Sequence, residues 1–112
     1  MTASDFRRLA LGLEGVVEAE HMNHPDFRVG GKIFATLAYP SKDWGVLMLT
    51  PDQQEFYVRA RPKMFTPVAG TWGRAGSTQV QLRSARKGPV REAMTAAWRS
   101  RAPKGLAAEI DL

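Results

Sequence analysis

The first residues of the chain have the pattern of an amphipathic helix. Apolar residues recur at the spacing i, i+3, i+4 and i+7, which forms one stripe along a helix: Phe6, Leu9, Ala10 and Leu13. Thr2 and Asp5 have the spacing of a capping box, in which a hydroxyl and a carboxylate bind free backbone amides at the helix start. The pattern predicts a helix that begins after Thr2 and ends at Gly12 or Gly15.

Two further helices are predicted from their end signals. Thr50 and Pro51 are a typical cap and first residue, and Gln53 stands three positions after the cap. This helix must end near Arg61, because Pro62 follows. The last helix begins at residue 89 and stops before residue 103. One face of it is apolar and is expected to lie in the core: Val90, Ala93, Met94, Ala97 and Trp98.

Strand patterns fill much of the remaining chain. Residues 16–20 alternate weakly, residues 44–49 form a continuous apolar run, and residues 78–83 alternate between apolar and polar positions. Residues 62–76 are rich in proline and glycine and predict a connection. Strands joined by short turns favour an antiparallel sheet, so we expect a single α+β domain over residues 1–112 with about three helices packed on a small sheet.

A hairpin is predicted around the Gly30-Gly31 pair, since glycine readily adopts the positive φ angles of a two-residue turn. In this register Val29 pairs with Lys32, Arg28 with Ile33 and Phe27 with Phe34. One face would then carry Phe27, Val29, Lys32 and Phe34, and the other Arg28, Ile33, Ala35 and Leu37. Arg28 and Lys32 therefore lie on opposite faces, which predicts a basic wing with two sides.

Composition narrows the function classes. The chain has 112 residues and no cysteine, which excludes disulfides and thiolate metal sites. It has no apolar run of about 20 residues, so we expect no membrane contact. The N-terminus lacks the apolar region of a signal peptide, and we expect a cytoplasmic monomer. Sixteen Lys and Arg against eleven Asp and Glu give a net charge of +5, which favours polyanionic partners.

Candidate catalytic and metal-binding residues are few. His21, His24 and Asp26 place two imidazoles and a carboxylate within six residues, and Glu18 or Glu20 could add oxygen. The alternative is that His24 and Asp26 hydrogen-bond the backbone at the start of the hairpin. No phosphate-binding glycine motif and no nucleophile elbow is present. We expect no metal, no cofactor and no enzymatic activity; an enzyme would need a concave site that gathers His21, His24 or Glu20.

Three places could contact nucleic acid. The first is the hairpin with Arg28 and Lys32, and the second is the loop of Trp72, Gly73 and Arg74, which could present an indole and a guanidinium together. The third is the basic junction before the last helix, with Arg86 and Lys87. The alternatives are that Trp72 is a core residue and that the basic junction is only a solvated helix entry.

The hairpin at residues 24–35 resembles the signature of the MmcQ/YjbR-like proteins. The resemblance continues at residues 49–54, 72–74, 97–99 and 102–104. It implies a small α+β domain and a DNA-binding role, a label that rests on the similarity of the fold to a double-wing arrangement. The surface that it points to contains Arg28, Lys32, Trp72, Arg74 and Lys104. Family members often have a further aromatic residue shortly after the Trp-Gly-Arg loop, where this chain has Gly76-Ser77-Thr78.

The sequence thus favours a DNA-binding module that is not an enzyme and that contacts mainly phosphates through the hairpin wing and the Trp-Gly-Arg loop. The alternative is a protein- or small-molecule-interaction domain without nucleic-acid binding. A closed pocket lined by Trp72 and Tyr39, or basic residues scattered over the surface, would favour that alternative.

Overall fold

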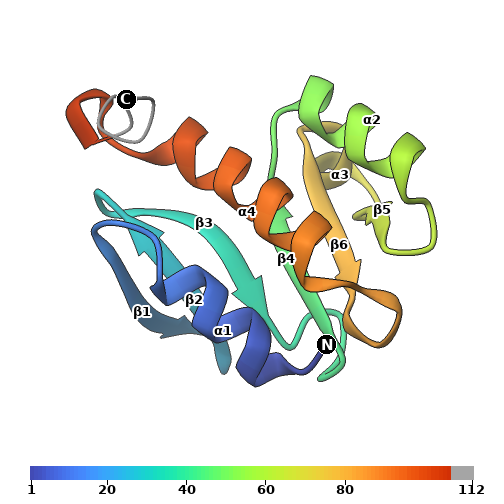
Figure 1. Ribbon diagram of the computed structural model, residues 1–112, viewed down its shortest axis with the longest axis horizontal. Helices are drawn as coiled ribbons and strands as arrows, with labels where there is room; N and C mark the ends of the chain where they lie inside the picture. Colours follow the sequence, from blue (N-terminus) through green and yellow to red (C-terminus); the bar gives the residue numbers. More distant parts are fainter. Residues whose placement is uncertain (107–112) are drawn as a thin grey trace.

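A six-stranded antiparallel sheet organises the chain in the computed structural model, which describes residues 1–106 (Figure 1). The spatial order of the strands is β1-β2-β3-β4-β6-β5. Their bounds are β1 Val16–His21, β2 His24–Val29, β3 Lys32–Leu37, β4 Trp44–Met48, β5 Phe65–Pro67 and β6 Ser77–Gln81. The sheet and its helices confirm the predicted α+β class.

Helices complete the fold: α1 Ala3–Leu11, α2 Pro51–Ala60, α3 Thr71–Arg74, the short 3-10 helix η1 Leu82–Ser84 and α4 Lys87–Arg101; residues 104–106 are also helical. Thr2 and Thr50 each cap a helix through a full capping box, as their spacing predicts. The helix α1 ends at the predicted Gly12, and α4 begins two residues before the predicted Pro89.

Helices α1 and α4 lie on one face of the sheet, in front of it in Figure 1, and their apolar stripes form the core with that face. Trp98 is fully buried there, as expected, and its indole Nε1 donates a hydrogen bond to the carbonyl of Glu14 at 3.0 Å. The opposite face, called the uncovered face below, carries no long helix within residues 1–106; the short α3 lies behind β6. No helix in this part of the chain has the length and hydrophobicity to cross a membrane.

The predicted hairpin register holds only next to the turn. Val29 pairs with Lys32 and Arg28 with Ile33, but Phe27 pairs with Ala35, because a β-bulge around Phe34 shifts the register. The predicted pairing of Phe27 with Phe34, and the faces derived from it, are therefore wrong beyond the bulge. The shift has a physical reason: it turns the apolar Ala35 and Leu37 toward the core and brings Thr36 opposite Asp26.

The predicted connection at residues 62–76 contains two elements that its composition does not reveal. The strand β5 pairs with β6 at the edge of the sheet, and α3 follows it. Both are short, so neither shows a period in the sequence. The pairing of β5 with β6 brings together the segments that precede and follow these strands. Both candidate sites contain residues of these segments.

Candidate functional site

A small cavity of about 50 Å³ lies on the uncovered face, and we call it the histidine pocket. It is lined by residues from four strands, two connections and the helix α3: His21, His24, Thr36, Tyr39, Val46, Met48, Val68 and Trp72. The β1–β2 turn places two of these side by side, because Met22 and Asn23 both adopt positive φ angles and pair His21 with His24. The pocket thus brings together the two histidines, and it also brings Tyr39 and Trp72 to one cavity.

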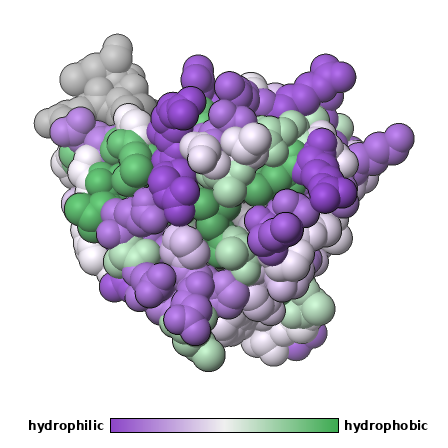
Figure 2. Space-filling view, turned by 90° about the horizontal axis from the view of Figure 1, so that it is seen from below, coloured by the Kyte–Doolittle hydropathy of each residue, from purple (hydrophilic) through white to green (hydrophobic). Residues whose placement is uncertain are grey.

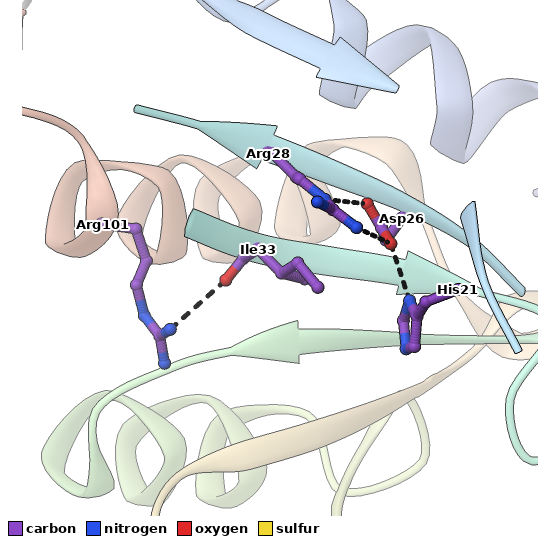
Figure 3. Close-up of polar contacts among 5 residues, drawn as sticks. All are labelled: His21, Asp26, Arg28, Ile33 and Arg101. Carbon is purple, nitrogen blue, oxygen red and sulfur yellow. Dashed lines mark hydrogen bonds and ion pairs between the residues drawn. The ribbon is translucent and has the colours of Figure 1, made fainter. Parts of the chain in front are cut away.

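Asp26 lies next to the pocket and contacts His21, one of the residues that line it. Its side chain is fully buried. The Arg28 guanidinium donates to both carboxylate oxygens, through Nε at 2.8 Å and through a terminal nitrogen at 3.0 Å (Figure 3). His21 Nδ1 lies 2.6 Å from the Oδ2 atom of the same carboxylate. The hydrogen bonds from Arg28 hold the pKa of Asp26 below its usual value and outweigh burial, which acts in the opposite direction; the bond to His21 lowers it further.

The expected backbone hydrogen bonds of Asp26 are replaced by these side-chain contacts. The reason is the strand geometry, since Asp26 and Arg28 alternate onto the same face and His21 approaches from the neighbouring β1. A carboxylate can only accept, so His21 Nδ1 is the donor and its Nε2 atom is left to accept a hydrogen bond in the neutral ring. The His21 side chain is 41% exposed, so a ligand can reach it.

His24 also differs from the expectation that it hydrogen-bonds the backbone. Its Nδ1 atom is buried and has no hydrogen-bond partner. Its ring and the Tyr39 ring form a T-shaped contact, with centroids 5.9 Å apart and an interplanar angle of 85°. Buried polar atoms are nearly always paired, and His24 lines the cavity, so its unpaired ring nitrogen is a candidate partner for a hydrogen-bonding ligand.

Trp72 is 66% exposed and is not a core residue. The tight approach of α3 to the preceding chain holds it outward, because a Cβ atom on Gly73 would lie 1.5 Å from the Val68 carbonyl oxygen. Only glycine allows this contact. Arg74, on the same short helix, donates a hydrogen bond to the Thr71 hydroxyl at 3.1 Å and is exposed.

A second candidate site, called the basic groove, lies beyond the end of β6. It has a volume of about 400 Å³ and is lined by Ala60, Arg61, Pro62, Lys63, Met64, Ser84 and Arg86. Three of these residues are cations and none is an acid. The backbone N–H of Gln81 donates to the carbonyl of Met64 at 3.0 Å, which joins the α2–β5 connection to the end of β6.

Sequence reasoning identifies Arg86 in this groove but misses Arg61 and Lys63. The only signal for them is that they flank Pro62 after a helix, which does not reveal that the connection folds back against Arg86. The α4 helix adds to the positive potential here, because its first turn has no acidic residue and no side-chain cap. Lys87, the next residue, is instead turned toward Asp5, with Nζ 3.6 Å from Oδ1.

The remaining predicted residues lie at the hairpin end. A Cβ atom on Gly30 would lie 2.9 Å from the Pro103 ring, so the turn packs against the chain after α4. Arg101 donates to the carbonyl of Ile33 at 3.3 Å in the same region (Figure 3). The exposed Lys32 and Lys104 are therefore close to this contact, whereas Arg28 is bound to Asp26.

The residues predicted to contact nucleic acid thus occupy three separate places: the hairpin end, the uncovered face and the start of α4. These residues are Arg28, Lys32, Trp72, Arg74, Arg86, Lys87 and Lys104. The surface seen from below in Figure 2 is correspondingly mixed, with hydrophilic side chains interrupted by hydrophobic ones. Within residues 1–106, no three histidine, aspartate or glutamate side chains are grouped as a metal site would require.

Comparisons with known proteins agree with this fold. The sequence model of the YjbR family matches residues 11–100. The chain is also similar to a crystal structure of the Deinococcus radiodurans protein DR2400, a DUF419 domain, with a TM-score of 0.76 and 17% sequence identity. That match covers 99% of this chain and 88% of the other, and at this identity it concerns the fold. No curated protein matches the chain.

Proposed function

The chain belongs to the YjbR family, and we propose that it binds DNA through the phosphates without acting as an enzyme. The observation that carries the proposal is the basic groove, where Arg61, Lys63 and Arg86 converge and no carboxylate lines the site. Phosphate contacts of this kind release counterions and supply the affinity of most non-specific binding. We further propose a cytoplasmic location, since the sequence has no cysteine that an oxidising compartment would pair.

The groove suits phosphates better than the hairpin wing does. Its three cations have no acidic partner within residues 1–106. In the wing, by contrast, the charge of Arg28 is balanced by the buried Asp26. A phosphate would have to compete with that carboxylate for the same guanidinium, and its approach would leave a buried negative charge unpaired.

Titration of a fluorescent single-stranded decamer of dT at several salt concentrations tests the proposal. Three phosphate contacts predict a slope of log affinity against log salt of about −2.1 for a single strand. The triple variant Arg61→Ala/Lys63→Ala/Arg86→Ala should bring the slope close to zero. No binding at the lowest salt concentration would overturn DNA binding itself.

A matched control removes the same amount of charge elsewhere. The variant Lys32→Ala/Arg74→Ala/Lys104→Ala also loses three cations, all of them from the originally predicted surface. We expect it to keep the wild-type slope. If this variant loses the slope and the groove variant keeps it, the phosphates are contacted at the hairpin and the Trp-Gly-Arg loop instead.

A second candidate function has one specific observation in its favour. Tyr39 and Trp72 line the same cavity, which is the arrangement expected of a small-molecule or protein-interaction domain. This candidate predicts that flat aromatic compounds quench the exposed Trp72 while oligonucleotides do not bind at any salt concentration. The decamer titration therefore separates the two candidates.

A further inference from the structure

We propose that the histidine pocket captures one unpaired nucleobase, which stacks on Trp72 and hydrogen-bonds to the imidazoles of His21 and His24. This inference rests on the proposed DNA binding and deepens it, because it identifies the strand as single and gives the bases a site of their own. The pocket and the basic groove share no lining residue.

The charge of the pocket indicates a neutral ligand group. None of its lining residues is an aspartate, glutamate, lysine or arginine. The nearest carboxylate, Asp26, is bound by both Arg28 and His21. A phosphate would meet no lysine or arginine in the pocket and an ammonium group would meet no free carboxylate, whereas an uncharged base buries no charge when it enters.

The size of the pocket indicates a flat group held by one edge. A cavity of about 50 Å³ is well below the roughly 300–1,000 Å³ of sites that enclose a whole small molecule. It can admit the polar edge of a ring, while the rest of the ring stays outside. Trp72 at 66% and Tyr39 at 39% exposure line this cavity and offer aromatic surface to that outer part.

The polar atoms of the pocket match a base edge. His24 Nδ1 is buried without a partner, and His21 Nε2 is free because its Nδ1 atom is committed to Asp26. The edge of a base carries donors and acceptors side by side, so it can pair with both rings. Such an edge is blocked in a duplex, which is why the ligand must be unpaired.

The distance between the two sites fits one strand. Met48 of the pocket pairs with Ser77 at the start of β6, whereas the groove follows the end of β6. The five residues of β6 span roughly 17 Å at about 3.4 Å each. A strand with one phosphate per 3.4 Å or more covers that distance in about five nucleotides, so a decamer can occupy both sites.

Comparison of the dT decamer with an abasic decamer of equal charge tests the inference. The wild-type protein should bind the dT decamer about 5- to 150-fold more tightly, which is the contribution of one stacked base. Trp72→Ala should bind both decamers with the abasic affinity and an unchanged salt slope, and Trp72→Phe should retain most of the preference.

A variant of His24 tests the hydrogen bonds to the base separately from the stacking. His24→Phe keeps an aromatic ring beside Tyr39 but removes both ring nitrogens. It should weaken binding of the dT decamer without affecting binding of the abasic decamer; circular dichroism and the melting temperature verify that the variant folds.

Equal affinity of the wild-type protein for both decamers overturns the base pocket and leaves phosphate binding intact. Binding of neither decamer overturns the proposed function as well. An unaltered preference in His24→Phe overturns the hydrogen-bonding role of that residue.

Discussion

Asp26 is the residue on which the histidine pocket depends. Its carboxylate is fully buried, yet it binds two side chains that reach the surface, Arg28 and His21. It therefore fixes the orientation of one imidazole and neutralises one guanidinium at the same time. The free-energy cost of burying this charge is offset by three hydrogen bonds, two of which come from Arg28 in a bidentate geometry.

Replacement of Asp26 by Asn should destabilise the fold by about 1–3 kcal/mol at pH 7, because an amide cannot accept all three hydrogen bonds. The pKa of Asp26 is lowered in the folded state, so its stabilising effect is complete above the unfolded pKa of about 3.9 and is lost as pH falls through the folded value. Urea unfolding of both proteins between pH 7 and pH 2.5 should thus show curves that converge below about pH 4.

The exposed pair of Glu55 and Arg59 provides the control. Both side chains are more than half exposed and lie one helical turn apart, so Glu55→Gln should change the unfolding free energy by no more than about 0.5 kcal/mol. Parallel unfolding curves for wild type and Asp26→Asn down to pH 2.5 would show that the carboxylate is not held below its usual pKa.

Short elements position the chemistry on the uncovered face. The four-residue α3 carries Trp72, and Gly70 precedes it with a φ of 81°. The helix can sit against the preceding chain only because Gly73 has no side chain at its contact with Val68. The exposure of the indole is therefore a consequence of backbone packing and not of its own polarity.

Gly73→Ala should displace α3, because its Cβ atom would overlap the Val68 carbonyl. We expect a loss of about 1–3 kcal/mol in unfolding free energy and a changed Trp72 environment in the fluorescence spectrum. Gly88→Ala is the matched control, since a Cβ atom there meets nothing within 4 Å and alanine favours a helix. A Gly73→Ala protein with wild-type stability would contradict the tight packing of α3.

The elements that the sequence predicts are those long enough to show a period or a cap. The helices after Thr2 and Thr50 and the apolar face around Trp98 are of this kind. The strand β5 and the helix α3 are three and four residues long; β5 is held by its pairing with β6, and α3 packs against β6. The bulge at Phe34 follows from burial of Ala35 and Leu37 in the core, which a turn sequence does not encode.

The sequence predicts which side chains can form the candidate sites, but not which contacts those side chains make. His21, His24 and Asp26 are close in sequence, so their grouping could be anticipated, but the partners of Asp26 could not. The histidine pocket needs β4 and the approach to α3 as well as the hairpin. Such a site is a product of the sheet order, in which strands distant in sequence become neighbours.

At the scale of the whole molecule, contacts between distant segments join the two ends of the described chain to one core. The amino group of Met1 donates to the carbonyl of Leu82 at 2.8 Å, and the Trp98 indole donates to the carbonyl of Glu14. Trp98→Phe should cost at least about 1 kcal/mol, because it loses the hydrogen bond and leaves a small cavity; Trp98→Ala should cost about 3–5 kcal/mol, because its cavity is larger. Denaturant unfolding measures both, and Trp72→Ala, at an exposed site, should be within about 0.5 kcal/mol of wild type.

The net charge of +5 acts over the whole surface and does not distinguish one polyanion from another. Heparin, which carries charge but no bases, should therefore bind at low salt and compete with the dT decamer for the basic groove. The groove triple variant should bind heparin more weakly, because the three cations that have no acidic partner there are removed. Trp72→Ala should bind heparin as the wild type does, since heparin has no aromatic base to stack on the indole. The competition is measured by displacement of the fluorescent decamer, and weaker heparin binding by Trp72→Ala would mean that the indole acts on charge contacts and not on bases.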